Sequence, residues 1–556
     1  MNHQNYSSVF PGRKVLVFVP HEDDEINVAG ALIAGLCREN FQVICVFAAN
    51  GDRSYLAETR IGEAVRALKV LGVPKENVII LGYPDGGLDA SRCVFMHGRG
   101  QVMDVEGRTE TYGIEGKPDF CMSLHGFHRP YTWEGFCEDI RDLLLQYRPD
   151  SIVGVDFDSH PDHRMCSIAL EQVLGELLNR KDNDWHPLVL KAFAYNTGFE
   201  SVKDFYEDNL LSTRFNREKI MNPLTETDNP VYEWEKRLRL PVPKDCRAPL
   251  LKDNLIFRAT QCHLSQRAML KAEQIINGDE VFWVRRTDNL LFRGKVTVSS
   301  GEGKYLHDFR MISARDIRPK HNVAMEDCLW VPDQTDSSPF CRCDFSVPQH
   351  VESISLYGDP ENHGRILKSR LIFSTGYSCE IPSLRSWGQE TVIAFPPQDD
   401  VEWVKYQILE TEGEQAGLSE WEIFAKKKLP CRVLHILADG NFAYEWHVPY
   451  GKKGPVITAY TYGIDEPVRW FWDGVSCLPE ELQKRCACVT EPHMIRAEAG
   501  GLFHEISLIP GSSWWRKKRA VHILADRLYL WMEKQRIKPA HHKLRVLKRK
   551  AKIARN

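Results

Sequence analysis

The stretch that decides the fold is KVLVFVPHEDDEINVAGAL, residues 14–32. Its apolar part, VLVFV (15–19), has the length of a buried strand, and it runs into His21 and the four acidic residues 22–25. Residues that directly follow a strand lie at its carboxyl end, which is where open α/β sheets bind ligands. Because four adjacent carboxylates repel one another, we expect them to serve a ligand and not the stability of the fold.

Similar apolar runs recur through the first half of the chain. They are VICVF (43–47), NVIIL (77–81), SIVGVD (151–156) and LVLKAFAY (188–195), and helical patterns lie between several of them, at 29–39, 58–71, 133–146 and 163–178. This alternation predicts an α/β domain with a doubly wound parallel sheet. A helical run at 253–276 and the strand EVFWVRR (280–286) are expected to close the domain, residues 1–290.

The second half of the chain has the texture of β-sandwiches. Short β-like runs such as SISLYGDP and RLIFSTGYS are separated by turn residues. We expect one β-sandwich at 315–428 and a second β-rich, sandwich-like domain at 430–510. The aromatic stretch EPVRWFWDG (466–474) is either a sugar-stacking platform or part of a core, and core packing is the commoner use of such residues.

A second polar segment resembles the first in its layout. In SIVGVDFDSHPDHRMCSIAL (151–170), an apolar strand again runs into a polar turn, HPDH (160–163), and then into a helix. Two parallel strands would deliver imidazoles and carboxylates to one edge of the sheet. Two His and one Asp suit a zinc ion with a fourth position open for water. Alone, either segment could be a solvated turn or a helix N-terminus with favourable charges.

These motifs resemble those of a known family. PHEDDE (20–25) resembles the (P/A)HPDDE signature of the LmbE-like, or PIG-L, family of zinc-dependent N-deacetylases, and HPDH resembles its second signature. Weaker matches follow in the family's order: ANGD (49–52), RIGEAVRALKVLGV (60–73), LGYPDGGL (81–88) and SQ (265–266). The resemblance covers residues 11–290 and implies a Rossmann-like fold.

The resemblance implies a metal centre and a base. His21, Asp24 and His163 stand where the family has its metal ligands, so the expected cofactor is Zn²⁺, although other divalent ions accept the same ligands. Asp23 stands at the position of the general base that takes a proton from the attacking water.

The resemblance also assigns roles around this centre. His160 would stabilise the charged transition state and protonate the leaving amine, and Asp162 would orient His160. Arg60 and Asp85 match positions that contact the sugar. Glu22 departs from the family, which usually has proline there; proline stiffens the turn, whereas glutamate adds a charge.

The implied function is hydrolysis of the acetamide of an N-acetylated sugar to a free amine and acetate. We expect the N-acetylhexosamine to be part of a glycan, a glycolipid or a nucleotide-sugar, carried by a lipid or a polymer, in the envelope polysaccharide biosynthesis of a bacterium. The alternatives are an amidase acting on another acyl-amine, such as a thiol–sugar conjugate, and a non-catalytic glycan-binding protein.

Two further segments have possible roles in binding. The long polar stretch 91–131 contains His97, His125, His128, Arg129 and Tyr131, which line the substrate cleft or are ordinary surface residues. Residues 325–425, ending in GLSEWEIF, resemble a galactose-binding-like (discoidin-type) module. Such modules often bind sugars at their loop tips, and a purely structural sandwich is the alternative.

The tail, residues 511–556, is strongly basic. It has 15 Lys and Arg against two acids, whereas the whole chain has a net charge of −4, so the remainder carries −17. A stripe of Val521, Leu524, Leu528 and Trp531 predicts an amphipathic helix that Pro539 ends. We expect this basic helical tail to bind an anionic membrane surface; a solvated tail is the alternative, and no nucleic acid is expected.

Composition is that of an ordinary globular protein, with 43% apolar and 27% charged residues among 556. No apolar run reaches the length of a transmembrane helix, and the N-terminus lacks a secretory signal pattern. We therefore expect a cytoplasmic protein, peripheral on the inner face of the membrane. The sixteen scattered cysteines are expected to be reduced thiols, mostly buried.

Overall fold

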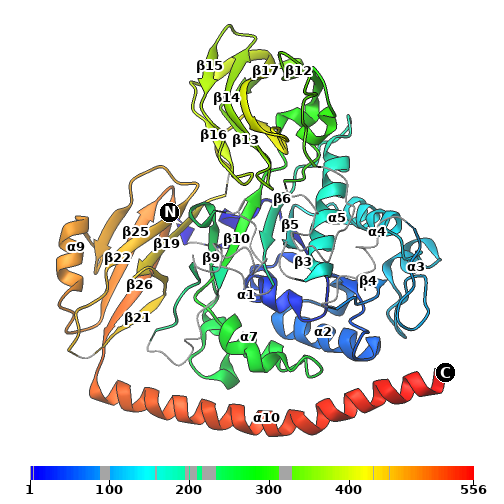
Figure 1. The fold of residues 1–556 in the computed structure, drawn as a ribbon. Coiled ribbons are helices and arrows are strands. Elements are labelled where there is room, and N and C mark those ends of the chain that lie inside the picture. Colours follow the sequence, from blue (N-terminus) through cyan, green and yellow to red (C-terminus); the bar gives the residue numbers. More distant parts are fainter. Residues whose placement is uncertain are drawn as a thin grey trace.

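The apolar runs of the first half form a single mixed sheet (Figure 1). The computed structural model describes residues 2–3, 5–87, 100–156, 160–194, 199–200, 209–215, 233–311, 328–429, 431–449 and 451–555. In spatial order the strands are β4 (Val78–Tyr83), β3 (Gln42–Ala49), β2 (Lys14–Val19), β5 (Ser151–Val155), β6 (Leu188–Ala192), β10 (Asp279–Arg285) and β9 (Leu238–Pro241). Strands β4 to β6 run parallel, as predicted.

The last two strands of this sheet are antiparallel, in directions that the sequence did not specify. Strand β10 pairs antiparallel with β6 and with β9. A parallel partner for β6 would need a crossover connection, usually a helix. Here the chain reaches β10 through α7 (Leu255–Thr260), η8 (Ala268–Lys271) and α8 (Ala272–Ile275), short helices where the sequence suggested one long helical run at 253–276.

Helices cover the sheet as right-handed crossovers require. Helices α1 (Asp24–Arg38) and α2 (Ala57–Leu71) make the connections that step from β2 toward β4, and they contact each other. Helices α4 (Trp133–Tyr147) and α5 (Pro161–Leu178) make the connections that step the other way, and they pack together as well. A short helix, α3 (Phe120–His125), precedes α4.

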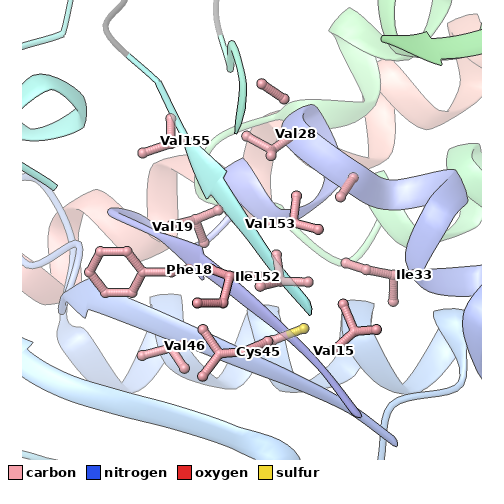
Figure 2. Close-up of a cluster of buried hydrophobic side chains, with 14 of the residues drawn as sticks. Val15, Phe18, Val19, Val28, Ile33, Cys45, Val46, Ile152, Val153 and Val155 are labelled. Atoms are coloured by element: carbon pink, nitrogen blue, oxygen red, sulfur yellow. The ribbon is translucent and has the colours of Figure 1, made fainter. Parts of the chain in front are cut away.

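The core of this domain lies between the sheet and its helices. Figure 2 shows Val15, Phe18 and Val19 of β2 packed with Ile152 and Val153 of β5. Each of these side chains is no more than 1% exposed. The strands read as continuous apolar runs because both of their faces are covered.

Helix α1 contains a break in its backbone, and a residue of strand β10 binds the N–H groups next to it. Ala29 has φ −154°, which interrupts the helical backbone. The buried carboxyl group of Glu280 on β10 accepts hydrogen bonds from the backbone N–H groups of Ala31 (2.8 Å) and Leu32 (2.6 Å). Glu280 therefore satisfies donors that the break removes from the helical pattern.

The middle of the chain forms an antiparallel sandwich. One sheet contains β11 (Gly294–Val298), β12 (Phe340–Val351), β17 (Gln398–Gly413), β14 (Gly364–Phe373) and β15 (Ser378–Ile381). The other contains β16 (Thr391–Ile393), β13 (Ser353–Tyr357) and β18 (Glu420–Phe424). Strand β11 precedes residue 315, the expected start of this module, which lies outside the described residues.

A third region is also rich in antiparallel strands. One sheet contains β21 (Glu445–Val448), β23 (Arg469–Trp472), β24 (Val475–Cys477), β25 (His493–Ala499) and β26 (Leu502–Pro510); the other contains β19 (Val433–Ala438), β20 (Asn441–Phe442) and β22 (Ile457–Tyr462). Strand β1 (Asn2–His3), from the start of the chain, pairs in parallel with β26. Helix α9 (Pro479–Cys486) lies between β24 and β25.

Trp470 and Trp472 of the aromatic stretch are 7% and 8% exposed and belong to the core of this region. They are therefore used in packing, the commoner of the two alternatives. The cysteines among the described residues are free thiols, and most of them are buried.

The tail forms one long helix, α10 (Ser513–Arg555), which runs past α7 and α2 along one side of the molecule (Figure 1). The expectation that Pro539 ends the helix is wrong, because the helix continues through it. Proline removes one intrahelical hydrogen bond. Contacts on both sides hold the helix: Ile537 is 2% exposed, and the His541 ring lies 2.8 Å from the Tyr55 hydroxyl. Among the residues described, no helix has the length and apolar composition to cross a membrane.

Candidate active site

The two polar segments lie where the strand order of the sheet reverses. From β2 the chain moves outward to β3 and β4, and it then returns to β5 on the other side of β2. Such a switch point, at the carboxyl ends of the strands, is where open α/β sheets bind ligands. Residues 20–25 follow β2, and residues 160–163 follow β5 and open α5.

The three predicted imidazoles meet at this point. The ring centroids of His21 and His163 are 5.4 Å apart, those of His21 and His160 are 4.7 Å apart, and those of His160 and His163 are 4.6 Å apart. The side chains are buried, with exposures of 5%, 4% and 0% for His21, His160 and His163. The structure thus brings together residues that are far apart in the sequence.

One carboxylate oxygen of Asp24 lies close to both of the predicted histidine ligands. Asp24 Oδ2 lies 3.2 Å from His21 Nδ1 and 3.2 Å from His163 Nε2. Two ligands about 2.1 Å from one tetrahedral ion would be about 3.4 Å apart. These two distances suit neighbouring ligands of one ion. Among the described residues, however, the groups whose donor atoms all lie within 4.8 Å of one another contain His21 with His160 and His163, or His21 with Asp85 and Asp162, and not Asp24. Burial would raise the pKa of Asp24, but the His163 and His21 imidazoles hold it well below its usual value.

Other donors lie close enough to take part in binding an ion. Nitrogen atoms of His21, His160 and His163 lie within 4.8 Å of one another, and so do donor atoms of His21, Asp85 and Asp162. The structure therefore provides a cluster of possible ligands at one place, of which His21 is common to both groups.

Asp162 lies against His21. Its Oδ2 is 3.0 Å from His21 Nε2 and accepts a hydrogen bond of 3.0 Å from the backbone N–H of Gly86. The other ring nitrogen of His21 faces Asp24. A histidine that binds a metal usually donates its second N–H to a carboxylate, which fixes the ring. The sequence suggested Asp162 as a partner of His160; this geometry suits it to orient His21.

His160 is the N-cap of α5. Its Nδ1 accepts a hydrogen bond of 3.2 Å from the backbone N–H of Asp162. Burial and the neighbouring His21 and His163 imidazoles lower the pKa of His160 to about 4, so the ring is neutral at pH 7. Because Nδ1 accepts, the neutral ring carries its proton on Nε2.

Asp23 sits at the strained start of α1. Its φ is +138°, a region that residues other than glycine rarely adopt. Its backbone N–H donates to Glu25 Oε2 (2.8 Å), and its Oδ1 accepts a hydrogen bond of 3.1 Å from Arg60 Nη2. Burial raises the pKa of Asp23 despite the Arg60 guanidinium beside it. Strain of this kind is often stored at functional sites.

Arg60, from α2, is only 4% exposed, and its guanidinium is directed at the acidic turn. Besides Asp23, its Nη2 donates to the backbone carbonyl of Glu22. The Glu22 carboxylate is fully buried, with Oε2 3.6 Å from Arg60 Nε. A Cβ at Gly51, which has φ +56°, would come within 2.4 Å of Glu22 Oε2. Gly51 therefore leaves the space that this glutamate occupies.

Asp85 also lies at the cluster. Its Oδ1 is 3.7 Å from His21 Nε2 and accepts a hydrogen bond of 2.7 Å from the backbone N–H of Gly87. Its backbone N–H donates to Asp52 Oδ1 (3.2 Å), and the Tyr112 hydroxyl donates to the other oxygen of Asp52. Whether Arg60 and Asp85 contact a sugar stays a prediction.

Two supporting pairs were not singled out from the sequence. His263 and Glu25, both fully buried, are joined by a contact of 2.8 Å, which holds the first turn of α1. Ser265, of the SQ motif, donates to Glu63 of α2 through its backbone N–H (2.9 Å) and its hydroxyl (2.6 Å). The position of His263 just before that motif was the available signal.

The long polar stretch contributes to the scaffold. Arg129 makes ion pairs with Asp139 (3.0 Å) and Asp142 (3.1 Å) of α4, and Tyr131 is fully buried in the core. His125 pairs with Asp142 (2.8 Å) and His128 with Asp119 (2.6 Å). His97 lies outside the described residues.

The comparison with family models agrees with this geometry. Residues 16–174 match the PIG-L family, described as GlcNAc-PI de-N-acetylase. This part of the chain is a PIG-L (LmbE-like) deacetylase domain. The PIG-L domain includes both polar segments. Residues 294–424 match DUF7402, a domain of unknown function, and this range begins at β11.

Solved structures similar to the chain are of two kinds. The N,N'-diacetylchitobiose deacetylase from Pyrococcus horikoshii shares 17% identity, over 50% of this chain and 84% of that one, with a TM-score of 0.27. A chitosan-binding module from a Paenibacillus chitosanase/glucanase shares 15% identity over 24% of this chain and 98% of that one, with a TM-score of 0.18. The family 32 carbohydrate-binding module of Clostridium perfringens NanJ shares 15% identity over 24% of this chain and 94% of that one, with a TM-score of 0.19. No curated protein matches the sequence.

Proposed function

We propose that the protein is a metal-dependent N-deacetylase that hydrolyses the acetamide of an N-acetylated sugar to a free amine and acetate. The observation that carries the proposal is the position of Asp24 Oδ2, at 3.2 Å from both His21 Nδ1 and His163 Nε2, one residue after Asp23, whose backbone φ is +138°. Ligands and a base that are this close are what metal-assisted amide hydrolysis requires.

His21, Asp24 and His163 would hold the metal, and zinc suits this ligand set. When bound, the ion would polarise the amide carbonyl and lower the pKa of a water molecule to about 7. Asp162 fixes the His21 ring from behind through its contact of 3.0 Å with Nε2. Asp85, 3.7 Å from the same nitrogen, adds negative charge at this point.

Asp23 is the residue that we assign as general base. Arg60 holds one of its oxygens, which leaves the other to take a proton from water. Because burial raises the pKa of Asp23, its carboxylate is a better proton acceptor than an exposed aspartate. With φ +138°, Asp23 lies outside the helical conformation, which begins at Asp24.

We assign to His160 the stabilisation of the negative charge that develops on the carbonyl oxygen. Its neutral ring keeps a proton on Nε2, which can donate a hydrogen bond to that oxygen. A buried donor of this kind is worth more than one in water, because solvent does not compete with it. To protonate the leaving amine, as the family resemblance implies, His160 would first have to take up a second proton, since its neutral ring would otherwise be left as an anion.

The finer assignment of the substrate is part of the proposal. We propose an N-acetylhexosamine in a glycan, a glycolipid or a nucleotide-sugar, lipid- or polymer-linked, in polysaccharide biosynthesis. The membership of residues 16–174 in the PIG-L family supports the class of reaction. An amidase on another acyl-amine is the alternative for the substrate, and a glycan-binding protein without turnover is the alternative for the activity.

The test is acetate release from a panel of substrates by the full chain, before and after chelation and with zinc, iron or manganese restored. The panel contains free N-acetylhexosamines, UDP-linked sugars, N-acetylglucosaminyl lipids and chitooligosaccharides, with N-acylated thiol–sugar conjugates for the alternative. Metal-dependent acetate release from any of the N-acetylated sugars supports the proposal. Release from the thiol–sugar conjugates alone, or glycan binding without release, contradicts it.

A further inference from the structure

Helix α10 contacts the rest of the protein along its whole length with one face. The Trp515 ring stacks on His447 at a centroid distance of 4.5 Å, Asp526 accepts the backbone N–H of Leu251 (3.0 Å), and Tyr529 packs against Phe257. Farther along, buried Ile537 joins the core of the PIG-L domain. The helix is thus held in a fixed rotation about its axis.

The opposite face of α10 is apolar and exposed. We call this set the outer face; its members, with their exposed fractions, are Trp514 (67%), Val521 (64%), Leu524 (69%), Leu528 (56%), Trp531 (57%) and Met532 (54%). At about 100° of rotation per residue, these positions fall within a stripe roughly 100° wide, opposite the face that carries Asp526 and Ile537. A gathering of large apolar side chains at such exposures marks an interaction site.

Charges on α10 are sorted in the same way. Its two acidic residues face inward: Asp526 is 2% exposed, and Glu533 contacts Gln261 (3.2 Å). The lysines that flank the outer face include Lys534, Lys538 and Lys543, all of which are exposed. None of these three lysines forms an ion pair within the described part of the chain. The side turned to solvent is therefore apolar along its centre and basic along its edges.

We propose that the outer face of α10 binds the surface of an anionic lipid bilayer. The apolar side chains would enter the boundary between headgroups and acyl chains, and the lysines on both edges would contact anionic headgroups. Trp514 and Trp531 suit this boundary, because an indole has an apolar body and a polar N–H. The exposed apolar stripe selects a lipid surface over nucleic acid, since a nucleic acid has no apolar layer that these side chains could enter.

The same contacts place the candidate site near the bound surface. The C-terminal half of α10 reaches the loop after β3, where His541 meets Tyr55 (2.8 Å), and the loop after β4, where Lys548 pairs with Glu106. Both loops lie at the carboxyl edge of the sheet, the edge that holds His21. Bilayer binding would therefore hold this edge close to the lipid, where an acylated carrier would present a sugar.

The experiment is flotation of the full chain with vesicles of phosphatidylcholine alone and of phosphatidylcholine with 30% phosphatidylglycerol. The first variant is the triple substitution Leu524→Gln, Leu528→Gln and Trp531→Gln. Its control is Val347→Gln, Val456→Gln and Val475→Gln, because these valines are equally exposed (63%, 60% and 62%) but lie in the β regions. The second variant is Lys534→Gln, Lys538→Gln and Lys543→Gln.

Wild type and the valine control are expected to float with the anionic vesicles and to bind the neutral ones far less. The outer-face variant should bind about tenfold or more weakly, because it removes apolar area that enters the bilayer. The lysine variant should bind about 100-fold more weakly, since each basic residue near an anionic surface contributes about a factor of five.

Unchanged thermal melting of each variant shows that the fold is intact. The proposal is overturned if wild type does not float with anionic vesicles, or if the outer-face variant floats as well as the valine control. It is also overturned if the outer face instead mediates self-association, seen in sedimentation as a dimer that the outer-face variant loses. These measurements use no sugar substrate, so they are independent of the proposed deacetylase activity.

Discussion

The acidic turn after β2 and the outer face of α10 place residues against their usual preferences in opposite ways. At the turn, Glu22, Asp24 and Glu25 are at most 1% exposed although each carries a carboxyl group. On the helix, Leu524 and Trp531 are 69% and 57% exposed although each is large and apolar. Buried carboxyl groups reduce stability, and exposed apolar groups add little to it, so neither arrangement is explained by folding.

The difference between the two regions shows what each is built to meet. The turn surrounds its carboxyl groups with imidazoles and one guanidinium, so it is suited to a small cation and a polar substrate. The helix keeps its acids inward and presents apolar and basic groups, so it is suited to an extended anionic surface. Four predictions test this contrast.

The largest effect is expected at the turn from Asp23→Asn. The amide cannot accept a proton as the carboxylate does, so metal-dependent acetate release should fall by about 10²- to 10⁴-fold. The metal content, measured on the purified protein, should be unchanged, because Asp24 and the two imidazoles remain. Near-normal turnover in this variant would remove Asp23 from the role of base.

Glu280 is a buried carboxyl group outside the acidic turn, so it shows what burial alone does to such a group. Burial raises the pKa of Glu280 from 4.5 to about 8. Between these pH values the folded protein keeps a proton that the unfolded chain has lost. The contribution of Glu280 to stability is therefore complete below pH 4.5 and is lost as the pH rises through 8.

Glu280→Gln should remove this dependence. Between pH 5 and pH 9, the melting temperature of wild type should fall relative to that of the variant, by the equivalent of a few kcal/mol. The comparison uses thermal melts at both pH values, with Glu302→Gln, at an exposed position, as the control. A constant difference between wild type and Glu280→Gln would contradict the pKa shift.

Asp162→Asn tests whether Asp162 holds the predicted metal ligand His21 in place. An amide at this position no longer offers His21 Nε2 a charged acceptor, and such changes weaken metal binding or activity by about 10- to 100-fold. We expect zinc affinity, measured by competition with a chelator, to fall by this factor with the fold intact. Unchanged zinc affinity with lower activity would instead support the original assignment of Asp162 to His160.

The smallest effect is expected on the helix. Leu524→Gln and Leu528→Gln change exposed side chains, so the free energy of unfolding should change by less than about 0.5 kcal/mol. Ile537→Ala, on the buried face of the same helix, should cost about 2–5 kcal/mol. A loss of stability from the outer-face pair as large as that from Ile537→Ala would mean that another part of the chain covers the outer face.

The sequence predicted the strands and helices of the PIG-L domain well, because their signals are local. The runs 15–19 and 43–47 lie within β2 and β3, and the helix expected at 58–71 is α2, Ala57–Leu71. The meeting of residues 21 and 163 followed from parallel strands alone, since such strands place their carboxyl ends at one edge.

The features that local patterns did not specify, or specified wrongly, have long-range causes. Pro539 lies inside a helix because contacts from Ile537 and His541 hold both sides of it, and those partners are distant in the sequence. The antiparallel entry of β10 depends on how the chain returns to the sheet, which no local pattern encodes. The partner of Asp162 depends on which imidazole lies on its side of the turn, and the spacing of the motif does not specify that.

The attachment of α10 has a practical consequence for work on the catalytic half. A fragment cut at residue 290 would lose Tyr529 and Ile537, and it would uncover apolar groups such as Phe257 that these side chains shield. It would also lose Asp526, which accepts the backbone N–H of Leu251, and leave a polar group without its acceptor. Such a truncated protein should be prone to aggregate, so that assays and crystallisation are better served by the complete polypeptide.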